Sequence, residues 1–159
     1  MNDGTGRSIT YLRLSVTDLC DLRCRYCMAE EGMEKHPHGA LCSFEELQTF
    51  AVAAARLGVN KIRITGGEPL VRRDIPELCA MLRAVPGVAE LCLTTNGIRL
   101  AQLARPLRKA GVDRLNISLD SLRPERYRAI TRVDGLDAVL SGIRAAEDAG
   151  FENLKINCV

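Results

Sequence analysis

The sequence predicts an α/β protein whose parallel strands form part of a (β/α) barrel. One observation is a repeat in which Gly, then Val or Phe, precedes Ile or Leu at the fifth and seventh positions and a small polar residue at the eighth. A second observation is that stretches with a helical period separate these repeats, which implies parallel strands joined by right-handed crossovers. A third is that apolar and polar residues alternate within each strand, so one sheet face is apolar and the other polar. The repeats are Gly58–Thr65, Gly87–Thr94, Gly111–Ser118 and Gly150–Asn157.

The elements are expected in the order strand, then helix and strand four times. A first strand over Tyr11–Val16 has no preceding helix. Helices are expected where apolar residues recur every three or four positions, with each repeat glycine as a left-handed C-cap. The apolar stripes are Leu47, Phe50, Ala51, Ala54 and Leu57, and Leu136, Val139, Leu140, Ile143 and Ala146.

Local signals predict where these helices begin. Ser43 and Glu46 have the spacing of a capping box, and Asp74 is a plausible N-cap with a proline tolerated in the first turn. Pro106 leaves two alternatives: it opens the segment before Gly111, or it kinks a helix that begins near residue 100.

The alternation assigns each strand residue to a face. Ile62 and Ile64 exemplify the apolar face, while Arg63 and Thr65 exemplify the polar one. A Rossmann-like sheet with an accidental polar stripe is the alternative, but no G-x-G-x-x-G follows a strand. A curved sheet with a wet or ligand-filled concave side fits the alternation better. Functional residues are then expected at the carboxyl ends of the strands. The other expected concave residues are Arg13, Ser15, Cys92, Thr94, Asn116, Ser118, Lys155 and Asn157.

Composition restricts the class of protein. The chain has 159 residues, 47% of them hydrophobic, and a formal net charge of +2, which suits one folded domain and gives no bulk charge for nucleic-acid binding. Apolar runs never reach the ~18 residues of a membrane span, and the polar N-terminus lacks a signal-peptide profile. We therefore expect a cytoplasmic protein with no membrane and no nucleic-acid partner.

Three of the seven cysteines lie close together after the first strand. Cys20, Cys24 and Cys27 can hold three irons of a 4Fe–4S cluster and leave the fourth iron open to another ligand. Zinc is the alternative, with His36, His38 or Cys42 as the fourth ligand. No role is assigned to Cys42, Cys79, Cys92 or Cys158 otherwise.

Two motifs together resemble those of the radical S-adenosylmethionine enzymes. The first is Cys-x3-Cys-x-aromatic-Cys, with Tyr26 as the aromatic residue, and the second is the run Gly66–Pro69, which reads Gly-Gly-Glu-Pro after the second strand. The resemblance implies that the methionine part of S-adenosylmethionine chelates the open iron and that the second motif meets its amino group. Glycines allow a close backbone approach, and an acidic side chain suits an ammonium group.

Within that family the chain is most similar to the GTP 3′,8-cyclases of molybdenum cofactor biosynthesis. Matching stretches include residues 11–18, 26–28, 57–70, 94–97, 116–121 and 155–157, and Ala29 departs from a usual proline. The resemblance implies that Tyr26, Gly67, Glu68 and Ser118 bind S-adenosylmethionine. It also implies that Arg13, Arg63, Thr94 and Lys155 bind GTP, and all four lie on the expected polar face; Lys61 is a weaker candidate.

The resemblance further implies a mechanism. A 5′-deoxyadenosyl radical takes the 3′ hydrogen of GTP, whose carbon radical closes onto C8 of guanine, so no general acid or base is named. The implied partners are GTP and a reduced flavodoxin- or ferredoxin-type electron donor, and the resemblance is compatible with a homodimer. The alternatives are another radical S-adenosylmethionine enzyme, for example a peptide-modifying one, or a zinc-stabilised binding module that is not an enzyme.

The repeat also bears on the extent of the domain. Residues 1–159 are expected to be the N-terminal portion of a radical S-adenosylmethionine core domain, cut after about the fifth strand and inactive alone in full turnover. Six arginines outside the sheet are expected on solvated faces or at domain contacts. They are Arg72, Arg73, Arg123, Arg126, Arg128 and Arg132.

Overall fold

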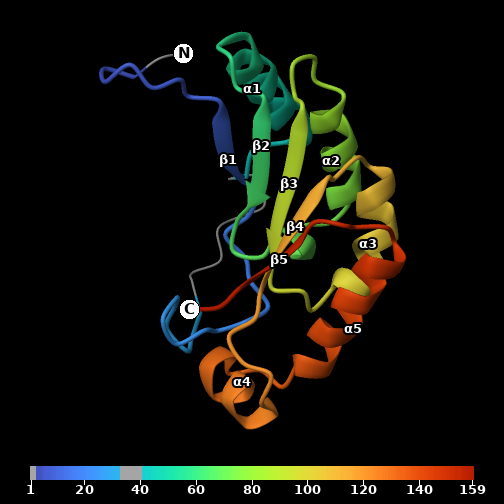
Figure 1. Cartoon of the computed structure of the whole chain (residues 1–159). Coiled ribbons are helices and arrows are strands. Elements are labelled where there is room, and N and C mark those ends of the chain that lie inside the picture. Colours follow the sequence, from blue (N-terminus) through green and yellow to red (C-terminus); the bar gives the residue numbers. More distant parts are fainter. Residues whose placement is uncertain (1–2, 33–40) are drawn as a thin grey trace.

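Five parallel strands form one sheet in the order β1-β2-β3-β4-β5 in the computed structural model, which describes residues 3–32 and 41–159 (Figure 1). Each strand pairs with the next along the chain, so the sheet grows in one direction, as in a barrel, and the predicted fold class is confirmed. The strands are β1 (Tyr11–Ser15), β2 (Lys61–Thr65), β3 (Glu90–Thr95), β4 (Arg114–Ser118) and β5 (Leu154–Asn157).

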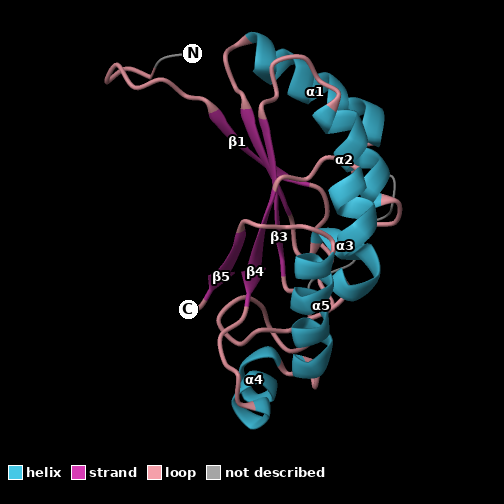
Figure 2. Cartoon of the chain, turned by 45° about the vertical axis from the view of Figure 1, so that its right-hand side comes forward, coloured by secondary structure: helices cyan, strands magenta, loops and turns pink. Residues whose placement is uncertain are grey.

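The connecting helices cover one face of this sheet. Figure 2 shows α1, α2, α3 and α5 as one curved layer behind the strands, whereas α4 lies apart at the end of the molecule. The opposite sheet face carries no helix within the described residues. The helices are α1 (Phe44–Arg56), the short 3-10 helix η2 (Pro69–Val71), α2 (Ile75–Arg83), α3 (Leu100–Lys109), α4 (Pro124–Thr131) and α5 (Leu136–Asp148).

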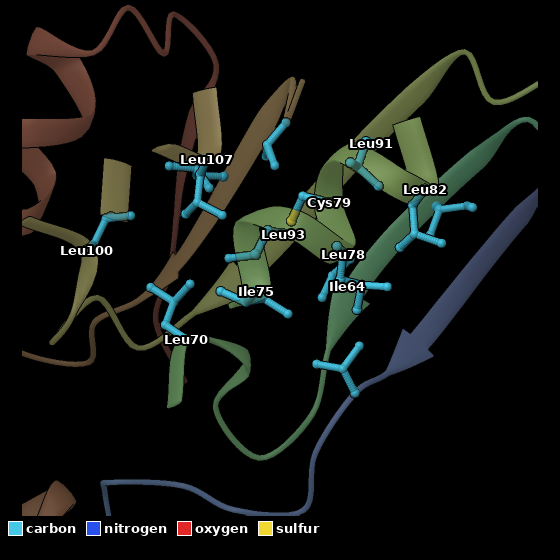
Figure 3. Close-up of a cluster of buried hydrophobic side chains, with 14 of the residues drawn as sticks. Ile64, Leu70, Ile75, Leu78, Cys79, Leu82, Leu91, Leu93, Leu100 and Leu107 are labelled. Atoms are coloured by element: carbon cyan, nitrogen blue, oxygen red, sulfur yellow. The ribbon is translucent and has the colours of Figure 1, made fainter. Parts of the chain in front are cut away.

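The core fills the space between the strands and this helical layer (Figure 3). Ile64 and Leu93 point from the sheet toward Leu78 of α2, and all three are fully buried. Gly142 of α5 approaches the carbonyl of Gly97 so closely that a Cβ there would lie 2.7 Å from that oxygen. This contact brings α5 against the start of α3, so the loop that follows β3 is fixed.

The predicted helix boundaries are partly confirmed. Ser43 and Glu46 form the capping box, with Glu46 N–H donating to the Ser43 hydroxyl at 3.2 Å and Ser43 N–H donating to the Glu46 carboxylate at 2.7 Å. Asp74 precedes α2 as predicted, but it adopts φ 57° and its side chain caps no helix N–H. Pro106 lies inside α3, which begins at Leu100. Of the two alternatives for Pro106, a helix that begins near residue 100 and contains the proline is therefore confirmed.

Three of the four repeat glycines follow a helix directly. Gly58, Gly111 and Gly150 have φ values between 82° and 99°, the left-handed conformation that glycine adopts without strain. Gly87 also has a positive φ, but α2 ends at Arg83, so this glycine belongs to a separate turn and its predicted C-cap role is wrong.

The predicted faces of the sheet are confirmed, but two residues differ in exposure from what their face suggests. Cys92 shares the polar face with its register partner Arg63, and its thiol donates to the Glu90 carboxylate at 3.4 Å, yet it is fully buried. Ile156 shares the apolar face with its register partner Ile117, yet it is 46% exposed. The helix α4 was not predicted.

Arg72, which was expected on a solvated face or at a domain contact, is bound within the fold. Its guanidinium donates to the carbonyls of Val16 and Cys42, each at 2.6 Å.

The helices are also short. Within residues 3–32 and 41–159, none combines the length and the apolar character that crossing a bilayer requires.

Candidate functional site

A cavity of about 220 Å³ opens at the carboxyl ends of β1 to β4, where the chemistry of a parallel barrel is expected. It collects all three cysteines of the triplet and six more of the predicted site residues. These are Arg13, Tyr26, Gly67, Glu68, Thr94 and Ser118. Arg63 and Lys155 do not line it. They lie further back along the same face of the sheet.

The cysteines belong to a tight loop after β1. Cys27 N–H and Met28 N–H both donate to the Cys24 carbonyl, at 2.9 and 3.1 Å, which brings Cys24 and Cys27 into one turn. The Arg23 guanidinium donates to the carbonyls of Cys20 and Leu22 at 2.6 and 2.8 Å. The loop is therefore folded by its own hydrogen bonds, with the cysteines on the side of the cavity.

The three thiols line one cavity. Among the described residues, no group of three or more His, Cys, Asp or Glu side chains is arranged to hold a single metal ion. In a polynuclear cluster, each thiolate binds a different iron. His36 and His38, the alternative zinc ligands, lie outside the described residues.

Burial favours the protonated form of two thiols of this loop. It raises the pKa of both Cys20 and Cys24 above the ordinary thiol value, and nearby carboxylates such as Glu68 add to the effect at Cys20. Because only a thiolate binds iron, metal binding to this loop must release protons.

The Gly-Gly-Glu turn after β2 packs against the cysteine loop. Gly67 N–H donates to the Thr17 carbonyl and Glu68 N–H to the Leu19 carbonyl, both at 2.7 Å. A Cβ on Gly66 would lie 2.6 Å from the Thr17 carbonyl oxygen, so this position requires glycine. The glycines therefore serve first to join the turn to the chain's own backbone. The N–H of Gly67 is used there, which leaves its carbonyl for a ligand.

Glu68 is buried, and both of its carboxylate oxygens accept hydrogen bonds. Its carboxylate accepts from Leu70 N–H at 2.9 Å, Thr95 O–H at 2.8 Å and Asn96 N–H at 2.6 Å. It joins the ends of β2 and β3. Burial outweighs these bonds and raises the pKa of Glu68 to about 7. Oε1 accepts two of these bonds and Oε2 one, so Oε2 keeps one acceptor site, and a contact between Glu68 and a cofactor remains a prediction.

This pKa gives a pH-dependent stability. The folded chain holds the Glu68 proton up to about pH 7, whereas the unfolded chain loses it near the ordinary glutamate pKa of 4.5, so the free energy of unfolding falls as pH rises between these values. We expect the fall to be about 3 kcal/mol in metal-free protein. Urea unfolding at pH 5 and pH 8 should show it in the wild type and not in Glu68→Gln. Glu77→Gln, on an exposed position of α2, is the matched control, and equal pH dependence in all three proteins would contradict the assignment.

Two polar contacts at the cavity were missed from the sequence. Tyr26 O–H donates to the Asp120 carboxylate at 2.7 Å, which ties the cysteine loop to the end of β4. The Asn96 side chain donates to Asp21 at 2.7 Å, and Asp21 also pairs with Arg99 at 3.0 Å. Asp120 and Asn96 each follow a strand, so the rule that singled out the cysteine loop would also have singled out these two residues.

The cavity also contains an unpaired hydroxyl. Tyr127 of α4 is 2% exposed and lines the cavity, and its hydroxyl has no hydrogen-bond partner among the described residues. A buried polar atom without a partner costs free energy, so such an atom beside a cavity is a position where a ligand can bind. Sequence reasoning missed Tyr127 because it missed α4.

The remaining predicted substrate residues lie in a second, basic hollow of about 210 Å³ on the same sheet face. Arg63 connects the two hollows: its Nε donates to Tyr11 O–H at 2.9 Å and a terminal nitrogen to Thr94 O–H at 3.4 Å. Glu90 pairs with Lys61 at 2.9 Å and with Arg114 at 2.7 Å. The hollow is lined by Lys61, Arg63, Arg114, Asn116, Asn153, Leu154 and Lys155.

The other four cysteines are not part of the cavity lining, although the Cys158 thiol donates to the carbonyl of Asp120, a cavity residue, at 3.4 Å. Cys42 and Cys158 are exposed, while Cys79 and Cys92 are fully buried. None of the four lines the cavity, so the structure separates the triplet from the rest.

Comparison with known proteins agrees with the geometry. The profile of the Radical SAM superfamily matches residues 14–159. The GTP 3′,8-cyclase of Geobacter sulfurreducens is 57% identical over 157 residues, which is 99% of this chain and 48% of that protein. GTP 3′,8-cyclase 1 of Pseudomonas aeruginosa is 56% identical over 99% of this chain and 47% of its own length. The chain thus spans about half the length of these relatives.

Solved structures share the fold. Streptococcus suis SuiB bound to S-adenosylmethionine has a TM-score of 0.71 with 22% identity, over 94% of this chain and 32% of that one. HydG, a maturase of the [FeFe]-hydrogenase, has a TM-score of 0.74 with 13% identity, over 94% of this chain and 35% of that one.

Proposed function

This chain belongs to the radical S-adenosylmethionine superfamily, and on that premise we propose that it binds a 4Fe–4S cluster and S-adenosylmethionine and forms part of a GTP 3′,8-cyclase. We further propose that residues 1–159 are the N-terminal portion of that enzyme's radical S-adenosylmethionine core domain. The observation that carries the proposal is one cavity at the strand ends that collects the cysteine triplet, the glycine turn and polar residues of four strands.

The donor set of the cavity fits the cluster. Cys20, Cys24 and Cys27 supply three thiols, so a four-iron cluster held by them keeps one iron open. The described residues offer no fourth cysteine at this cavity. Such a cluster needs no further protein ligand, whereas a closed zinc site takes a fourth.

The same cavity offers polar groups for S-adenosylmethionine beside that cluster. The unpaired Tyr127 hydroxyl, the Gly67 carbonyl and the Ser118 hydroxyl are available to hold polar atoms of a ligand. Tyr26 is held at the cavity by its bond to Asp120, so its ring has a fixed orientation. When bound, the reduced cluster and S-adenosylmethionine supply a 5′-deoxyadenosyl radical.

The basic hollow supports the GTP part of the proposal. Lys61, Arg63, Arg114 and Lys155 surround it with one carboxylate, Glu90, among them, so the local charge is positive and suits a polyphosphate. Arg13 and Thr94 line the cysteine cavity on the same face. Side chains between the two hollows can therefore orient a nucleotide with its phosphates at one hollow and its sugar toward the other.

Further parts of the proposal concern partners and location. A flavodoxin- or ferredoxin-type protein would deliver the electron, and the enzyme would be cytoplasmic and homodimeric. The seven cysteines, all free, suit a reducing compartment.

The decisive experiment measures products under anaerobic conditions. The chain, reconstituted with iron and sulfide and reduced, should form 5′-deoxyadenosine and methionine from S-adenosylmethionine. A chimera in which this chain replaces the matched half of the Geobacter sulfurreducens enzyme should convert GTP to 3′,8-cyclo-GTP, detected by mass spectrometry. A colourless chain that holds zinc instead would refute the cluster. A chimera that cleaves S-adenosylmethionine but leaves GTP unchanged would favour another substrate, such as a peptide.

A further inference from the structure

The end of α4 supports the cysteine loop through the backbone. Arg23 N–H donates to the Thr131 carbonyl and Arg25 N–H to the Ile130 carbonyl, both at 3.0 Å. Carbonyls in the last turn of a helix lack partners within the helix, so the loop satisfies two of them. Figure 1 shows α4 at the same end of the molecule as this loop.

Arg132, the residue after α4, adds a side-chain contact. One terminal nitrogen of its guanidinium donates to the Arg23 carbonyl at 2.8 Å and to the Met28 carbonyl at 3.3 Å. These two carbonyls bracket the segment that carries Cys24 and Cys27. The Arg132 side chain is only 26% exposed, and its Nε lies 3.8 Å from the Glu30 carboxylate.

The backbone conformation of Arg132 indicates that this side chain is needed. Arg132 has φ 60°, and only it and Asp74 among the described non-glycine residues have a positive φ. Glycine and asparagine are the residues that favour this conformation after a helix. An arginine in that position costs conformational energy, and its guanidinium makes two hydrogen bonds that a glycine could not make.

We propose that Arg132 is a positioning residue for the cysteine loop. Its guanidinium holds together the two ends of segment 23–28 and fixes them to α4, so that Cys24 and Cys27 are presented to the cavity in a single arrangement. The inference rests on the proposed function, because the ligands so presented are those of the proposed cluster. It assigns a role to an arginine that sequence reasoning placed on a solvated face or at a domain contact.

The test uses the whole chain and a variant that removes the guanidinium without backbone strain. In Arg132→Gly, the positive φ is retained at no steric cost, so the melting temperature should stay close to that of the wild type. We expect amides in segment 23–28 of the metal-free chain to exchange hydrogen at least about tenfold faster, because two charge-assisted bonds are lost. After reconstitution, a chelator should remove iron about 10- to 100-fold faster. Arg132→Lys should restore part of both properties.

Arg126→Ala is the matched control, because Arg126 is exposed on the same helix. It should leave both readouts unchanged. Wild-type exchange rates in Arg132→Gly would overturn the proposal, and so would faster exchange accompanied by wild-type iron retention. If the wild-type chain acquires no iron at all, the proposed function fails, whereas the exchange of the metal-free chain still decides whether Arg132 holds the loop.

Discussion

Replacing Cys24 with serine is expected to leave the reconstituted chain without its 4Fe–4S cluster. Cys24 is one of only three cysteines at the cavity, so no spare thiol in the described residues can take its place. A serine hydroxyl has a much higher pKa than a thiol and is a poor ligand for iron. Bound iron should fall from about four per chain to background, with loss of the brown colour. Cleavage of S-adenosylmethionine should fall by more than about 100-fold, beyond the usual effect of losing an outer contact.

Cys42→Ser is the matched control for this experiment. Cys42 is exposed and lies away from the cavity, so its replacement should leave iron content, colour and cleavage at wild-type values. It also tests the zinc alternative, in which Cys42 is a candidate fourth ligand. Loss of the metal in both variants would contradict the cluster assignment and favour a four-ligand site.

The sheet was predictable because each strand carries its own pattern. Ile62, Ile64, Leu91 and Leu93 alternate with polar residues and are all fully buried in the structure, so a period of two was enough to place them. The helix α4 was not predictable in this way. Only Tyr127 and Thr131 of its eight residues are buried, which is too few for a recognisable apolar stripe. Pro124 at its first turn was the remaining signal.

The position of the site was predictable, but its internal contacts were not. The carboxyl ends of parallel strands lie at one edge of the sheet, so the sequence alone brought Cys20, Gly67 and Ser118 together. The bond between Tyr26 and Asp120 joins residues 94 positions apart, and no local pattern reports it. Glu68 shows the same limit. Its motif indicates an acidic contact near a ligand, yet its carboxylate is bonded to protein donors because the ends of β2 and β3 meet there.

Replacing Arg63 or Lys155 with alanine is expected to weaken GTP binding by about 10- to 100-fold in each case, the effect of losing a charge-assisted hydrogen bond. Arg63 lies between the two hollows and is fixed by Tyr11 and Thr94, so its guanidinium is already oriented for an anion. Lys155 lines the basic hollow and makes no ion pair among the described residues, which leaves its ammonium for a phosphate.

Dissociation constants for GTP, measured by calorimetry, should be compared with cleavage of S-adenosylmethionine in the same preparations. Neither Arg63 nor Lys155 lines the cysteine cavity, so cleavage should stay close to the wild-type rate while GTP affinity falls. Arg105→Ala is the matched control, because Arg105 is an exposed cation on α3, on the other side of the sheet. Unchanged GTP affinity in both Arg63→Ala and Lys155→Ala would remove the main support for GTP as the substrate. The radical formed at the cysteine cavity would then act on a different substrate. A parallel loss of cleavage would instead mean that the two hollows act as one site.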